Sequence, residues 1–199
     1  MALPIIKYGD VFEIETSVGL GYFQCVKEAP ANDLEIIRVF PGVYKNEEEA
    51  DLDNLVKGPE LYFLQFVLKY AVKKKCIKKI GNFLMPENVQ VPKLYRTKLM
   101  IRYDFVGWHI VDSETLWRRK TDKLSDEERR LSPWDSWNDT LLSERIASGW
   151  TLEQWTQHDL LFNNNYFPVN YQTGYYTAQT KTENDGSSSH QKRRGRIRQ

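Results

Sequence analysis

Near the start of the chain, apolar and polar side chains alternate with a period of two. Residues 10–15 follow this pattern, as a half-buried strand does. A turn with Gly19 and Gly21 separates them from a second extended run, 22–27, and a third run follows at 34–40. Three short strands joined by turns predict an antiparallel meander, the opening of a small barrel or half-barrel.

The next segment changes from acidic to apolar. Residues 46–55 predict a short helix capped by Asn46, with its carboxylates near the positive end of the helix dipole. Residues 60–68 form the most apolar run of the chain and predict a buried central strand. Further strand-like runs continue to Val111, so we expect a β-rich domain over residues 8–112.

From Ser113 the hydrophobic period becomes helical. Two capping boxes begin at Ser125 (S-x-x-E) and at Thr151 (T-x-x-Q). Between them Trp137 starts a series of apolar residues with i, i+4 spacing, which Gly149 ends. We therefore expect a tryptophan-rich helical extension over residues 113–163, packed on the β-rich domain.

The remaining residues, 164–199, read as a tail that is first aromatic and polar and then basic. Residues 181–199 contain one large aliphatic side chain, Ile197, which cannot offset the entropy of ordering them. The predicted fold is therefore α+β: an antiparallel β-meander or small half-barrel, then a short helical segment, then a disordered basic tail.

Composition narrows the class of protein. The chain has 199 residues, with 28 Lys+Arg against 27 Asp+Glu. Six basic and two acidic residues follow residue 180, so residues 1–180 carry a net charge of −3 and form a mildly acidic body. No run approaches about 20 apolar residues, and the N-terminus does not resemble a secretory signal. We expect a cytoplasmic protein with no membrane partner and with reduced Cys25 and Cys76, although a disulfide between them stays open.

The sequence contains no strong motif for catalysis, metal binding or cofactor binding. His109 and His158 lack the spacing of metal ligands, and the glycines near residue 20 lack the rest of a dinucleotide fingerprint. Glu13 and Glu15 share a strand face where Mg²⁺ could bind, but a solvated face is the favoured interpretation. A Cys25–His109 dyad stays open. We expect no catalytic residue, no metal site and no cofactor.

Two surface features suggest a protein partner. Six tryptophans are unusual in a chain of this length. They could pack in the core or contact a partner, and the sequence leaves both interpretations open. We predict that Trp134 and Trp137 are anchors for a partner. The predicted acidic contacts are Glu47, Glu48, Glu49, Asp51 and Asp53.

The alternative function is nucleic-acid binding through basic residues. The candidates in the body are Lys73, Lys74, Lys75, Lys78 and Lys79, and those in the tail are Arg193, Arg194, Arg196 and Arg198. The competing interpretation of the lysines is a solvent-facing helix turn, or an edge strand that they protect from association. The competing interpretation of the tail is that it only solvates the protein.

The order of motifs resembles one known family. Gly9-Asp10-Val11-Phe12-Glu13-Ile14, followed by Gly21-Tyr22-Phe23-Gln24-Cys25-Val26, resembles the opening of the immunity-protein-26 family found beside bacterial polymorphic toxins. The later strand 61–66, the segment Gly81 to Pro86 and Trp108-His109-Ile110 are similar to that pattern too. The resemblance covers residues 8–115, and the segment after 116 departs from it.

This resemblance implies a toxin-neutralising or conflict-related binding protein without an active site of its own. We therefore expect a non-catalytic protein that neutralises or scaffolds a protein partner. The partner would be a cognate bacterial toxin, or the chain would be a subunit of a bacterial conflict or antiphage defence system.

Overall fold

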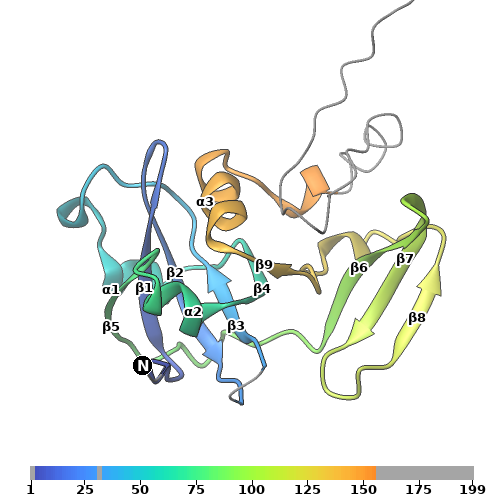
Figure 1. Ribbon diagram of the computed structural model, residues 1–199, viewed down its shortest axis with the longest axis horizontal. Coiled ribbons are helices and arrows are strands. Elements are labelled where there is room, and N and C mark those ends of the chain that lie inside the picture. Colours follow the sequence, from blue (N-terminus) through green and yellow to red (C-terminus); the bar gives the residue numbers. More distant parts are fainter. Residues whose placement is uncertain (1–2, 31–32, 156–199) are drawn as a thin grey trace, which may run out of the picture. The chain divides into compact units, whose positions relative to one another are not determined.

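The computed structural model describes residues 3–30 and 33–155, which belong to one compact unit. Two β-sheets and several short helices follow one another along this part of the chain, so the predicted α+β class is confirmed (Figure 1). The predicted basic tail and the end of the predicted helical extension, from residue 156 on, lie outside the described residues.

The larger sheet is built on the predicted meander. Strands β1 (Asp10–Thr16), β2 (Gly19–Lys27), β3 (Glu35–Val39) and β4 (Tyr62–Phe66) pair antiparallel in chain order. At one edge β5 (Lys78–Asn82) pairs antiparallel with β1, and at the other β9 (Ser136–Trp137) pairs parallel with β4. The sheet order is β5-β1-β2-β3-β4-β9.

This sheet is covered on both faces. Phe12, Phe23 and Ile37 belong to the main hydrophobic cluster on one face, whereas Val11 and Tyr22 belong to a second cluster on the other. Adjacent residues of a strand point to opposite faces, so both faces of β1 and β2 must be packed. The sequence predicts a half-buried strand over residues 10–15, but every residue from Asp10 to Ile14 is buried.

Three short helical segments lie beside this sheet. The 3₁₀ segment η1 (Glu47–Glu49) is capped by Asn46, whose side chain accepts the N–H of Glu49. Helix α1 (Leu52–Lys57) follows with Asp51 as its cap, and α2 (Leu68–Lys73) comes after β4. The single capped helix expected over 46–55 is therefore two consecutive capped turns, each with its own acidic or amide cap.

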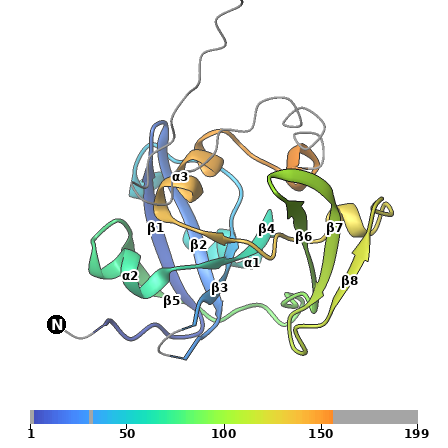
Figure 2. The same ribbon diagram turned by 45° about the vertical axis from the view of Figure 1, so that its right-hand side comes forward.

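The smaller sheet contains β6 (Leu94–Ile101), β7 (Asp104–Asp112) and β8 (Arg118–Thr121), all antiparallel. Trp108 and Ile110 of β7 belong to the same hydrophobic cluster as the larger sheet, so the two sheets share a core. Figures 1 and 2 show the chain that carries β9 crossing from the smaller sheet to α3.

The structure corrects the helical assignment of residues 113–137. This segment contains β8, the 3₁₀ turn η2 (Glu128–Arg130) and β9, and the helix α3 (Asp139–Ala147) starts only after its cap Asn138. Pro133, expected in a first helical turn, forms a parallel bridge with Arg96 instead. Pairing with β4 and β6 holds parts of this segment extended, and the helical spacing that begins at Trp137 belongs to α3.

The local helix signals between residues 125 and 154 are nevertheless confirmed. The backbone N–H and side chain of Ser125 pair with Glu128 as a capping box requires, and Thr151 pairs with Gln154 in the same way. Gly149 follows α3 with φ +61°. Helix caps can therefore be predicted from the sequence, even where the element that follows a cap is only a single turn.

Four tryptophans pack in the core: Trp108, Trp137, Trp150 and Trp155. The Trp137 and Trp150 ring centroids are 5.2 Å apart, and the Trp108 and Trp155 centroids are 5.3 Å apart. Tyr62 of β4 contacts both Trp137 and Trp150. The core-packing interpretation is therefore confirmed for these four indoles, because edge-to-face aromatic contacts fill the space between the sheets and α3.

Two fully buried arginines connect the layers. The Arg38 guanidinium donates to Gln24 Oε1 from Nε (2.9 Å) and to the Val56 carbonyl oxygen (2.7 Å), which fixes α1 against the sheet. The Arg96 Nε donates to the Leu131 carbonyl oxygen (3.1 Å), and its guanidinium lies over the Trp155 ring. A buried guanidinium is tolerated here because fixed acceptors and aromatic faces replace its hydration.

Candidate protein-binding surface

An acidic surface lies on two consecutive capped turns, η1 and the start of α1. We define it by five side chains, all exposed to solvent: Glu47, Glu48, Glu49, Asp51 and Asp53. Carboxylates gather there because each turn needs acceptors at its N-terminal end. The structure thus brings together all five acidic residues that the sequence predicts as partner contacts.

Local contacts occupy some of these carboxylates. Asp51 accepts the N–H of Asn54, Glu49 accepts the N–H of Lys45, and Glu47 pairs with Lys78. The side chains of Glu48 and Asp53 make no hydrogen bond or ion pair among the residues that the structure describes. These two carboxylates are therefore available to meet cations of a partner.

The acidic surface is held in place by the layer beneath it. Val56 of α1 is buried in the cluster with Val11, Tyr22 and Phe40, and Leu52 and Leu55 pack against the same cluster. Because the backbone beneath the carboxylates is packed, this surface loses less conformational freedom on binding than a loose loop would.

The predicted tryptophan anchors are not part of this surface. Trp137 is only 6% exposed and packs among aromatic rings in the main cluster, so its prediction as an anchor is wrong. Trp134 is half-buried, with its ring centroid 5.0 Å from that of Tyr95 in a third cluster. The parallel pairing of β9 with β4 turns Trp137 inward, and one sequence gives no signal for that pairing.

Trp117 is the indole that sequence reasoning did not select. It is 61% exposed, as is the adjacent Leu116. The structure therefore separates the predicted contacts into exposed carboxylates beside the larger sheet and buried or half-buried tryptophans, and it places an unpredicted exposed tryptophan directly before β8.

The predicted lysines of residues 73–79 lie in two places, at the end of α2 and on β5. Lys78 and Lys79 lie on the edge strand β5, where Lys78 pairs with Glu47 and Lys79 Nζ is 2.7 Å from Asp10 Oδ2. Lys73, Lys74 and Lys75 are exposed at and beyond the end of α2. Arg193, Arg194, Arg196 and Arg198 lie outside the described residues.

The partner of Lys79 is a fully buried carboxylate. Asp10 also accepts hydrogen bonds from the Asn82 side chain and the Lys7 N–H. Burial alone would raise the pKa of the Asp10 carboxyl, but these bonds and the Lys79 charge outweigh it, so that pKa lies below its ordinary value. Lys79 thus stabilises the β1–β5 edge and is not free for phosphate contacts.

The residues considered for catalysis or metal binding are differently placed. Cys25 and Cys76 are both free, and burial raises the pKa of the Cys25 thiol to about 12. Glu13 is buried and accepts the Tyr22 hydroxyl, whereas Glu15 is exposed. Among the described residues no group of three or more His, Cys, Asp or Glu side chains could hold a metal ion.

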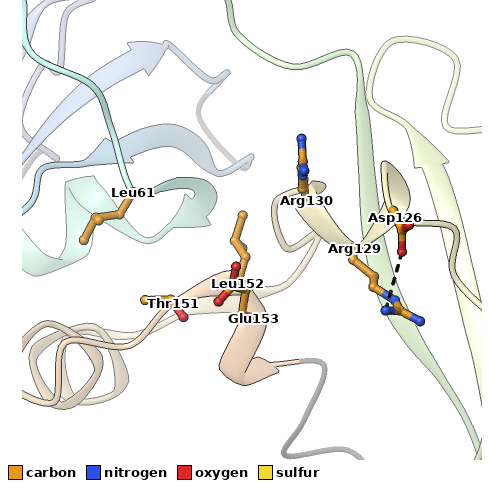
Figure 3. A pocket seen from close by; sticks show the side chains of 7 residues that line it. All are labelled: Leu61, Asp126, Arg129, Arg130, Thr151, Leu152 and Glu153. Carbon is orange, nitrogen blue, oxygen red and sulfur yellow. Dashed lines mark ion pairs between the residues drawn. The ribbon is translucent and has the colours of Figure 1, made fainter.

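One open groove was not foreseen from the sequence. It encloses about 820 Å³, and a smaller hollow of about 220 Å³ shares Leu61, Arg130 and Leu152 with it. Figure 3 shows its walls coming from the start of β4, from η2 and from the turn before Trp155. Because those segments are far apart in the chain, no local sequence motif predicts the groove. Its lining residues are Leu61, Asp126, Arg129, Arg130, Thr151, Leu152 and Glu153.

The groove has a mixed charge. Arg129 NH1 lies 3.6 Å from Asp126 Oδ1, and Glu153 provides a second carboxylate. Cations and anions that balance one another do not select a ligand of either sign. The acidic surface is therefore the better-defined recognition feature.

Comparison with protein-family models, with curated proteins and with solved structures finds no match to this chain. Within the described residues, the helices are too short or too polar to span a bilayer. The resemblance of residues 8–115 to the immunity-protein-26 family stays a prediction.

Proposed function

We propose that this protein is a non-catalytic binding protein whose acidic surface covers a basic surface of a protein partner. The partner would be a bacterial toxin that the chain neutralises, or another subunit of a conflict or antiphage defence system in which the chain acts as a scaffold. The observation that carries this proposal is the fixed, solvent-exposed set of five carboxylates on η1 and α1.

The mechanism is occlusion. A toxin that acts on nucleic acid needs Lys and Arg side chains to hold phosphates, so its active face is basic. Carboxylates at fixed positions attract that face at long range and then exclude the substrate from it. An interface of standard size, roughly 1,600 Å² in total, is compatible with a body of this length.

The test starts with a search of the neighbouring genes for a toxin domain, which is then co-expressed with this chain. The wild-type chain should prevent growth arrest, and Glu48→Lys with Asp53→Lys should not, because two available carboxylates become cations. Glu87→Lys with Glu144→Lys is the matched control, since both residues are exposed and lie outside the acidic surface. Failure of the wild-type chain to protect, or equal loss in the control, would contradict the proposal.

The second candidate function is nucleic-acid binding through Lys73, Lys74 and Lys75. These three lysines are exposed in succession, which favours contact with phosphates. The test is binding to an oligonucleotide, which should weaken steeply between about 50 and 200 mM salt and on replacing Lys74 and Lys75 by glutamate. Growth protection that survives Lys74→Glu with Lys75→Glu would exclude this alternative as the protective activity.

A further inference from the structure

Strand β8 is the open edge of the smaller sheet, whose order is β6-β7-β8. Arg118, Arg119 and Lys120 are all exposed there. Among the described residues their backbone pairs only with β7. An open edge presents unpaired N–H and C=O groups to which another strand can add. Short length and positive charge are also common ways of protecting an edge, so the edge by itself decides nothing.

The turn before β8 adds a feature that edge protection does not require. Asp112 Oδ1 accepts the N–H groups of Glu114 (2.9 Å) and Thr115 (3.0 Å), and the Asp112 carbonyl accepts the Leu116 N–H. This closed turn holds Leu116 at φ +59°, a conformation that branched side chains rarely adopt. It displays Leu116 and Trp117, each 61% exposed, directly beside the edge. Exposed tryptophan next to arginine is the composition of interface hot spots.

Charge selects the occupant of this edge. Arg118 and Lys120 are two residues apart and therefore share one face of β8. Arg119 points to the other face and pairs with Glu128. A second copy of this chain, added antiparallel, would place basic side chains opposite basic ones, which is unfavourable. Lys120 Nζ lies 3.5 Å from the exposed Asp122 Oδ1. A strand with acidic residues two positions apart would therefore be complementary to Arg118 and would replace Asp122 at Lys120.

We propose that β8 binds an extended segment of a partner protein with the pattern acidic-x-acidic-aromatic, added antiparallel to the edge. The two acidic residues lie opposite Lys120 and Arg118, and the aromatic residue packs beside Trp117. Backbone hydrogen bonds to the edge supply affinity, and the alternating side chains supply specificity. This site belongs to the smaller sheet and does not depend on the acidic surface beside the larger one (Figure 1).

The test uses the full chain and a fluorescein-labelled peptide with an acidic-x-acidic-tryptophan core flanked by threonines. Fluorescence anisotropy should show saturable binding to the wild-type chain. Arg118→Glu with Lys120→Glu should weaken it about tenfold or more, and so should Trp117→Ala. Lys74→Glu with Lys75→Glu is the control of equal charge change and should bind like wild type. Unchanged far-ultraviolet circular dichroism confirms that each variant is folded.

Three further probes distinguish strand addition from other kinds of binding. The same peptide with N-methyl groups on alternate residues should lose binding, because it cannot donate backbone hydrogen bonds to the edge. A peptide with lysines in place of the acidic residues should not bind. A single-stranded oligothymidylate should bind more weakly than the acidic peptide. Absence of binding by the acidic peptide at about 1 mM, undiminished binding of the N-methylated peptide, or tighter binding of the oligonucleotide would each overturn the proposal.

Discussion

Replacing Trp137 by alanine should destabilise the fold strongly without altering the acidic surface. The indole is 6% exposed, and a tryptophan buries roughly 150–250 Å². At about 25 cal/mol per Å² this area corresponds to roughly 4–6 kcal/mol, part of which the alanine methyl group retains. Ring contacts with Tyr62 at 5.6 Å and Trp150 at 5.2 Å add to the loss. We expect the free energy of unfolding to fall by about 4 kcal/mol, within the range for Trp→Ala in cores.

Urea denaturation followed by circular dichroism measures this change, and Trp117→Ala is the control. Because Trp117 is exposed, its removal should change stability by no more than about 0.5 kcal/mol. Binding to a partner, measured per folded molecule, should be unchanged by Trp137→Ala. A variant that keeps wild-type stability but no longer binds would refute the placement of Trp137 in the core and restore it as an interface anchor.

Three other perturbations follow from the packing and the charges. Gly21→Ala should cost about 1–3 kcal/mol in urea denaturation, because its Cβ would lie 2.6 Å from Ile146 Cγ2, and adding Ile146→Ala should make the loss less than additive. Arg38→Met should cost about 3 kcal/mol, because Gln24 Oε1 and a buried carbonyl lose their donor, and Arg38→Lys should not rescue it. Asp10→Asn should be less stable than wild type at pH 7. Since the folded pKa of Asp10 is lowered from 3.8, its contribution is present above that value and is lost as the pH falls through the lowered pKa. The gap between the two thermal unfolding midpoints should therefore close in acid, and a gap that persists there would contradict the ion-pair account.

Strands β1, β2 and β3 of the larger sheet could be predicted because their signal is local. The alternation over 10–15, the glycines near residue 20 and the proline after residue 40 delimit β1, β2 and β3 within a few residues. The caps at Asn46, Ser125 and Thr151 could be predicted for the same reason, since each depends on side chains within four positions.

The segment 113–137 could not be assigned correctly because its structure depends on distant partners. Pro133 lies against Arg96 of β6, and Trp137 pairs with Phe66 of β4. The i, i+4 spacing that begins at Trp137 is genuine, but it belongs to α3, which starts at Asp139. A single sequence gives no signal that two residues as far apart as Phe66 and Trp137 will pair in a sheet.

The candidate site was predicted in part. The acidic residues on 47–53 form one exposed surface, because charge density and capping are sequence properties. Burial of the indoles and of Arg38 depends on the elements that pack on both faces of the sheet. The sequence of β3 does not show that α1 covers Arg38. The exposed Trp117 was missed because the turn that displays it depends on Asp112 and on a left-handed Leu116.

Amide hydrogen exchange on the complex with the protein partner, once a toxin domain from a neighbouring gene has been shown to bind, tests the account most directly. The account predicts that slowed exchange on binding is concentrated in residues 46–57, which carry the acidic surface, and that it disappears when Glu48→Lys and Asp53→Lys abolish the complex. Slowed exchange confined to residues 73–75, with residues 46–57 exchanging as in the free protein, would contradict it.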